Sequence, residues 1–179
     1  MPADDSGPGQ RKIERFSPRP LALLRVPARR RALFFFLIDD RPALLVSACL
    51  LGTSCNHEGK HSRRPAVEAL AATHRVFPVC PEVCGGLSTP RAAAERVGDR
   101  VVNSEGDDVT DAYVSGARAA VDLARAVGAS RAILKARSPS CGSGQVYDGS
   151  FSRTLRVGEG VTAEALREAG VEVVDEEHC

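Results

Sequence analysis

The chain has 179 residues, with 24 Lys and Arg against 23 Asp and Glu and a formal net charge of +1. This length suits one domain whose core needs no disulfides to be stable, and 43% apolar and 26% charged residues are the composition of a globular protein. The near-neutral charge argues against a dedicated nucleic-acid binder. No apolar run approaches the ~20 residues that span a bilayer, which excludes an integral membrane protein. Six cysteines, no tryptophan and only 4% aromatic residues are the unusual features.

Residues 1–43 differ from the rest of the chain. They carry nine Arg and Lys against five Asp and Glu, together with six prolines that forbid any long regular element. The apolar stretch at 32–38 is short for a signal peptide and lies too far from Met1. The arginines at 29–31 are open to interpretation as a nucleic-acid or membrane contact, and a misassigned start codon is a further alternative. We expect a poorly ordered, basic, Pro-rich extension, followed by one domain over 44–179.

From residue 44 onwards, apolar runs typical of buried strands alternate with segments of helical periodicity. Thr110 is a candidate N-cap, and Gly128 and Gly170 each follow a helical pattern as expected after a helix C-terminus. This alternation predicts a mainly parallel sheet flanked by helices, a Rossmann-like three-layer α/β fold. The expected strands are 44–48, 76–79, 132–134 and 171–174, and the expected helices are 65–73, 110–127 and 162–169. The apolar face of the second helix is expected to contain Val114, Ala117, Val121, Ala124 and Val127.

Three of the six cysteines lie just after predicted strands. Cys49 follows the first strand, Cys80 follows the second, and Cys141 lies in the loop after the third. Loops at the carboxyl ends of parallel strands meet at one edge of the sheet, which is where open α/β sheets bind their ligands. If these strands are neighbours, the three thiols meet in space although 31 and 61 residues separate them in sequence.

A parallel sheet is typical of intracellular enzymes, in which clustered cysteines favour metal or redox chemistry over disulfides. Three thiolates suit a zinc ion completed by a fourth ligand, or an iron–sulfur cluster. The alternative is that each free cysteine is a small buried apolar residue. We adopt that alternative for Cys55, Cys84 and the terminal Cys179, and the spacing of Cys80 and Cys84 matches no standard zinc knuckle.

Two side chains beside these cysteines suggest chemistry beyond a structural site. Glu82 lies two residues after Cys80, and Ser138 lies three residues before Cys141. A carboxylate beside a Lewis-acidic metal can accept a proton from water, and a serine hydroxyl can donate or relay one. The structural alternatives are a charge at a helix start for Glu82 and a turn or N-cap role for Ser138.

Glycines and histidines near these residues are less informative. The glycines at 85–86 and at 142 and 144 permit close backbone approach to a ligand, or are simply loop residues. His57, His61 and His74 show no ligand spacing with the cysteines, so we expect solvated or packing roles for them.

Several ordered motifs resemble those of one known family. They are VSACLLG (46–52), PVCPEVCGGLSTPR (78–91), DVT (108–110), GA (116–117), ILKARSPSCG (133–142), YDGSF (147–151) and GEGVT (158–162). Together they resemble the domain of unknown function 523 family, which includes the 2-thiouracil desulfurases. The resemblance extends from about Leu44 to Glu177, nearly the whole predicted domain, and the segment before it has no counterpart in the family's common core.

The resemblance implies a [4Fe–4S] cluster that is held by three cysteines and leaves one iron without a protein ligand. The matching positions are Cys49, Cys80 and Cys141, and the family's catalytic acid/base glutamate and serine match Glu82 and Ser138. The chain departs from the family pattern at 56–59, where it reads Asn-His-Glu-Gly in place of the common Arg-Tyr-Asp-Gly. It also has Cys84 at a usually aliphatic position, which raises the prospect of a fourth thiol near the cluster.

The expected function is the non-redox desulfuration of a thiolated nucleobase such as 2-thiouracil, giving uracil and sulfide. In this interpretation the thiocarbonyl sulfur binds the open iron, Glu82 deprotonates the attacking water and Ser138 assists proton movement. One alternative is a non-catalytic iron–sulfur or zinc sensor or structural module, which would not use Glu82 or Ser138. Another is a metal-free nucleotide-processing enzyme, for which the sequence has no phosphate-binding motif.

These expectations extend to partners and location. We expect a cytoplasmic enzyme whose partner is a small thiolated heterocycle, with no membrane association and no stable nucleic-acid complex. The oligomeric state stays open.

Overall fold

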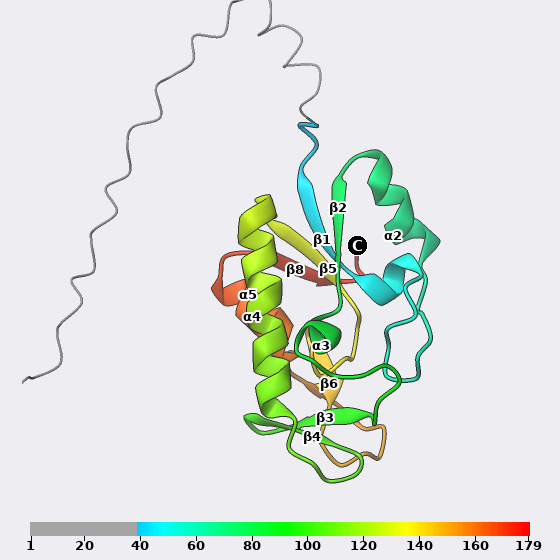
Figure 1. The fold of residues 1–179 in the computed structure, drawn as a ribbon, viewed down its shortest axis with the longest axis vertical. Coiled ribbons are helices and arrows are strands. Elements are labelled where there is room, and N and C mark those ends of the chain that lie inside the picture. Colours follow the sequence, from blue (N-terminus) through cyan, green and yellow to red (C-terminus); the bar gives the residue numbers. More distant parts are fainter. Residues whose placement is uncertain (1–38) are drawn as a thin grey trace, which may run out of the picture. The chain divides into compact units, whose positions relative to one another are not determined.

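The computed structural model describes residues 39–179 (Figure 1). Residues 1–38, and with them most of the predicted extension, lie outside the described residues. The residues just before the first strand already bond to the domain. The Arg41 guanidinium donates to the Ala71 carbonyl over 2.5 Å, and the Pro42 carbonyl accepts the backbone N–H of Arg75 over 3.0 Å. Arg41 and Pro42 are thus hydrogen-bonded to residues 71 and 75.

Four parallel strands form the central sheet, in the order β2-β1-β5-β8. They are β1 (Ala43–Ser47), β2 (Arg75–Val79), β5 (Arg131–Leu134) and β8 (Glu172–Asp175). Val46 of β1 lies opposite Pro78 on one side and Ile133 on the other. Pro78 is tolerated because β2 is an edge strand. The prediction of an α/β fold with a parallel sheet is confirmed, and each expected strand lies within one residue of the observed one.

Helices cover both faces of this sheet. On one face lie α4 (Thr110–Val127) and α5 (Val161–Glu168), which pack against each other and, through Ala120 and Leu166, against Leu45 (Figure 1). On the other face lie η1 (Ala48–Leu51) and α2 (Pro65–Ala69), which continues as η2 (Leu70–Ala72). Strand β1 is buried along its whole length because its successive side chains point alternately into these two apolar layers. This explains the continuous apolar run in its sequence.

Helix α4 matches the predicted range, but its first turn and its buried face differ from expectation. Gly128 ends the helix with φ 70°, the left-handed conformation that glycine adopts without a Cβ penalty. Thr110 is the first helical residue rather than the N-cap, and its hydroxyl donates to the Asp108 carboxylate over 2.5 Å. Val114 is 39% exposed, whereas the preceding Tyr113 is buried. The helix is thus rotated so that the large Tyr113 ring, and not Val114, fills the interior.

Several short elements were not expected from the sequence. They are α3 (Pro81–Cys84) and two antiparallel hairpins, the first of β3 (Ala94–Val97) and β4 (Arg100–Asn103), the second of β6 (Gln145–Tyr147) and β7 (Leu155–Val157). Strand β3 contacts β6, and both hairpins lie beyond the carboxyl ends of the sheet strands (Figure 1). The two hairpins form separate two-stranded sheets.

Two glycines allow α3 to lie directly against α4. A Cβ at Gly85 would collide with the Ala112 carbonyl, and a Cβ at Gly116 would collide with the Pro81 carbonyl. Gly85 therefore serves close helix packing, a role beyond the two alternatives that the sequence suggested, ligand approach and a place in a loop. Among the described residues, no helix is both long and apolar enough to cross a bilayer.

Candidate active site

A cavity of about 490 Å³ opens at the carboxyl ends of the sheet strands. Cys49 reaches it from η1 after β1, Cys80 from the position just before α3, and Cys141 from the turn after β5. These three strands are adjacent in the sheet, so segments distant in sequence meet at one edge. The three cysteines singled out in the sequence therefore line the same cavity, and all three are free thiols.

The three thiols on the wall of this cavity differ in burial. Cys49 and Cys141 are buried, with 8% and 5% of their surface exposed, and Cys80 is partly buried. Burial raises the pKa of the Cys141 thiol to about 12, because the thiolate loses its hydration there. Among residues 39–179, no three His, Cys, Asp or Glu side chains converge on a point that could hold a single metal ion. Thiols are soft donors of the kind that iron–sulfur clusters use.

A fourth cysteine, Cys55, also lines the cavity. The Cys55 backbone carbonyl accepts hydrogen bonds from the Cys80 thiol over 3.6 Å and from the Arg91 Nη2 over 3.1 Å. A hydrogen bond with Cys49 raises the pKa of the Cys55 thiol to about 11. By contrast, Cys84 and Cys179 are exposed and do not line the cavity. Their interpretation as buried apolar residues was wrong, and the extra thiol in the cavity is Cys55 rather than Cys84.

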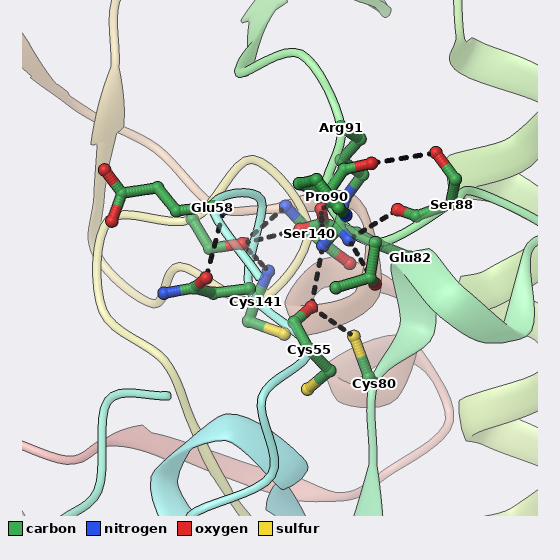
Figure 2. Close-up of polar contacts among 12 residues, drawn as sticks. Cys55, Glu58, Cys80, Glu82, Ser88, Pro90, Arg91, Ser140 and Cys141 are labelled. Atoms are coloured by element: carbon green, nitrogen blue, oxygen red, sulfur yellow. Dashed lines mark hydrogen bonds and ion pairs between the residues drawn. The ribbon is translucent and has the colours of Figure 1, made fainter. Parts of the chain in front are cut away.

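Glu82 projects from α3 into the cavity and is held by Arg91. The Arg91 Nε and Nη2 atoms lie 2.7 and 2.6 Å from Glu82 Oε2, and the two side chains are 8% and 13% exposed (Figure 2). Arg91 also donates to the Ser88 carbonyl over 3.0 Å, which fixes the loop after α3. One carboxylate oxygen is thus fully engaged by the guanidinium, and Oε1 stays available on the other side.

Ser138 contacts the other oxygen of the same carboxylate. Its Oγ donates to Glu82 Oε1 over 3.4 Å and accepts the backbone N–H groups of Ser140 and Cys141, each over 3.1 Å. Because two donors occupy the hydroxyl's lone pairs, its own proton is left to point at Glu82. The same hydroxyl therefore accepts hydrogen bonds within its turn and contacts Glu82, so the structural and catalytic roles considered for Ser138 are compatible.

Tyr113 and Lys135 complete the wall near these groups. Burial, reinforced by the Glu82 carboxylate, raises the pKa of the Tyr113 phenol far above its usual range, so the ring carries a neutral hydroxyl. The Lys135 ammonium pairs with Glu176 over 2.5 Å, and the Glu176 side chain is fully buried. That carboxylate also accepts the backbone N–H of Ala136 over 2.6 Å, which ties the loop after β5 to the end of β8.

A family model described as 2-thiouracil desulfurase matches residues 44–178, about three quarters of the chain. The chain belongs to the 2-thiouracil desulfurase family. An uncharacterized protein of Bacillus subtilis (strain 168), YbbK, is 40% identical over 143 residues, which are 74% of this chain and 95% of YbbK. A solved structure of TudS, a [4Fe–4S]-dependent thiouracil desulfidase, is 43% identical, with a TM-score of 0.73 over 76% of this chain and 92% of TudS.

Membership in this family confirms the resemblance found in the sequence motifs, and the structure adds residues that the sequence reasoning missed. Arg91 stood in the motif PVCPEVCGGLSTPR without an assigned role, because nothing in the spacing indicates that it folds back onto Glu82. His57 was expected to be solvated or packed. Its side chain is exposed but lines the cavity, and its carbonyl accepts the Arg91 backbone N–H over 2.9 Å.

The segment 56–59, which the motif resemblance led us to expect to differ from the family pattern, borders the same cavity. The Asn56 side chain closes its turn by accepting the backbone N–H groups of Glu58 and Lys60, over 3.1 and 2.7 Å. Asn56 and His57 both line the cavity. The unusual residues thus occupy a position where they can contact a ligand.

Proposed function

We propose that the protein is a [4Fe–4S]-dependent desulfurase that removes sulfur from a thiolated nucleobase such as 2-thiouracil, giving uracil and sulfide. The observation that carries this proposal is the Glu82 carboxylate, which Arg91 anchors and Ser138 contacts, in the cavity that the three strand-end cysteines line. A merely structural cluster site would have no use for such a pair. The desulfidase activity of the similar TudS supports the same conclusion.

Cys49, Cys80 and Cys141 would hold the cluster in this proposal. All three are free thiols on the wall of one cavity, and thiolates are the usual ligands of iron–sulfur clusters. A cluster with only three protein ligands would supply a Lewis-acidic iron with an open position for a soft thiocarbonyl sulfur. The free thiols also fit a reducing compartment, and we place the enzyme in the cytoplasm.

The protein's own contribution is to activate water and to move protons. Glu82 is the general base, because its Oε1 is free of the Arg91 contact and faces the cavity residue Ser138. The water loses a proton to Glu82 as its oxygen bonds to the thiocarbonyl carbon. Ser138 relays a proton toward the ring or the leaving sulfur. One water is consumed and one hydrogen sulfide is released for each carbonyl formed, so no electron donor or acceptor is needed.

The test is sulfide release from 2-thiouracil by anaerobically purified, cluster-loaded protein. Glu82→Gln keeps the volume and the hydrogen-bond acceptor but cannot take up a proton, so turnover should fall by about 10²–10⁴-fold with the iron content unchanged. Ser138→Ala should lose about 10²-fold for the same reason. Glu68→Gln is the matched control, because Glu68 pairs with Arg63 outside the cavity and should not affect turnover.

Two outcomes would contradict the proposal. Wild-type protein that holds its full cluster yet releases no sulfide would point to a non-catalytic module. Glu82→Gln and Ser138→Ala variants that turn over at the wild-type rate would remove both residues from the mechanism.

A further inference from the structure

Most of the aromatic side chains in the part of the chain that the structure describes line the cavity. Residues 39–179 contain four aromatic residues, and three of them, Tyr113, Tyr147 and Phe151, line it. Tyr113 is 2% exposed, so its ring belongs to the wall, whereas Phe151 is 40% exposed. An exposed aromatic ring on a cavity wall loses the benefit of burial unless a ligand covers it. Phe151 is therefore placed to meet a bound molecule.

A buried carboxylate holds Phe151 in this position. Glu95 of β3 is 8% exposed, and its Oε2 accepts the backbone N–H groups of Gly149 and Phe151, over 2.9 and 3.0 Å. Phe151 has φ 56°, a left-handed conformation that is uncommon for a bulky residue. The loop between β6 and β7 is thus fixed in a conformation that its own sequence disfavours. Such outliers concentrate at ligand-binding positions.

Gly149 allows the loop between β6 and β7 to lie close enough to β3 for these hydrogen bonds to form. A Cβ at this position would lie 2.8 Å from the Arg96 carbonyl, so only glycine lets the loop approach β3 this closely. The motif YDGSF, left without a function by the sequence reasoning, therefore has a structural explanation. Its glycine brings the loop onto β3, where Glu95 can bind it, and its phenylalanine lines the cavity.

We propose that Phe151 is a substrate-binding residue that stacks on the face of a planar heteroaromatic ring held in the cavity. This inference rests on the proposed function and specifies its substrate class. Stacking on a phenyl ring favours flat aromatic thiones over aliphatic thioamides, which offer no ring face. Glu95 is the positioning residue, because it acts on the ligand only through the loop that it holds.

The first test separates binding from chemistry. Phe151→Ala should raise KM for 2-thiouracil about tenfold and weaken the equilibrium binding of uracil, which has no sulfur, by a similar factor, with kcat within about twofold. Phe151→Tyr keeps a ring and should restore both values. Val157→Ala is the matched control, because Val157 is 84% exposed on the adjacent strand and does not line this cavity. Unchanged KM and uracil binding in folded Phe151→Ala would overturn the inference.

The second test uses the absence of tryptophan from the chain. Phe151→Trp places a single indole on the cavity wall, and Val157→Trp places one outside it. Titration of the cluster-loaded proteins with uracil should quench the first fluorescence saturably and leave the second unchanged. Saturable quenching in a protein that never desulfurates 2-thiouracil would support the stacking site and contradict the proposed function. Normal turnover of 2-thiouracil, with no quenching in Phe151→Trp and no change in KM in Phe151→Ala, would support the proposed function and contradict the stacking site.

Discussion

Arg91 holds Glu82 through two of its nitrogens, which lie 2.7 and 2.6 Å from the same carboxylate oxygen in a nearly solvent-free part of the cavity. The pair joins α3 to the loop between α3 and β3, which contains Arg91. The same guanidinium also reaches the Cys55 carbonyl, whose other partner is the Cys80 thiol. Arg91 therefore connects the proposed general base to the Cys55 backbone beside one proposed cluster ligand, Cys80, and a change at Arg91 should affect both stability and turnover.

Arg91→Met should destabilise the protein and lower activity. Removing one partner of a buried ion pair leaves the Glu82 charge uncompensated, so the free energy of unfolding should fall by about 3 kcal/mol. Chemical denaturation measures the stability, and sulfide release measures kcat. Arg63→Met is the control, because the Arg63–Glu68 pair lies on the surface and should contribute far less. Equal effects of the two substitutions would show that the Arg91–Glu82 pair contributes no more to stability and turnover than a surface ion pair.

The cysteines should differ sharply in iron binding. Ala at Cys49, Cys80 or Cys141 should abolish stable cluster assembly, measured as iron and sulfide content after anaerobic reconstitution. Cys84→Ala and Cys179→Ala should retain full iron, because both side chains are exposed outside the cavity. Cys55→Ala should also retain the cluster, since the Cys55 contact with Arg91 uses its backbone carbonyl and survives the substitution. Full iron content in any of the first three variants would remove that residue from the ligand set.

The domain boundary can be tested with two truncations. We propose that residues 1–38 are dispensable, so a chain that begins at residue 39 should keep its iron content and melting temperature. Removal of residues 1–42 should lower the melting temperature, because it deletes the Arg41 contact with Ala71 and the Pro42 carbonyl that binds Arg75. Insoluble protein or lost iron in the shorter deletion would show that the first 38 residues are needed by the domain.

Strong local patterns were the part of the fold that could be predicted. The apolar run of β1 indicates a strand buried on both faces, and the helical periodicity of apolar residues before Gly128 predicts α4. The parallel order of the strands then brought Cys49, Cys80 and Cys141 to one edge without any close sequence spacing. This step depended only on the rule that parallel strands end on the same side.

Features set by tertiary contacts could not be predicted. Strands β6 and β7 have three residues each, too few for a recognisable alternation. The orientation of α4 follows from the Tyr113 ring, whose burial beside Glu82 no helical period reveals. Arg91 approaches Glu82 only because the loop between them folds back, and no spacing rule relates residues across such a loop.

The close packing of α3 on α4 provides the last prediction. In an exposed helix, replacing an interior glycine with alanine stabilises by about 1 kcal/mol. At Gly116 the added methyl would instead collide with the Pro81 carbonyl, which belongs to the turn that carries Glu82. Gly116→Ala should therefore lower the free energy of unfolding by about 1–3 kcal/mol and reduce kcat, because α3 must shift. Ser115→Ala, at the exposed neighbouring position, should be neutral or slightly stabilising. A Gly116→Ala variant that is more stable than wild type and fully active would show that the contact between the two helices is looser than the structure has it.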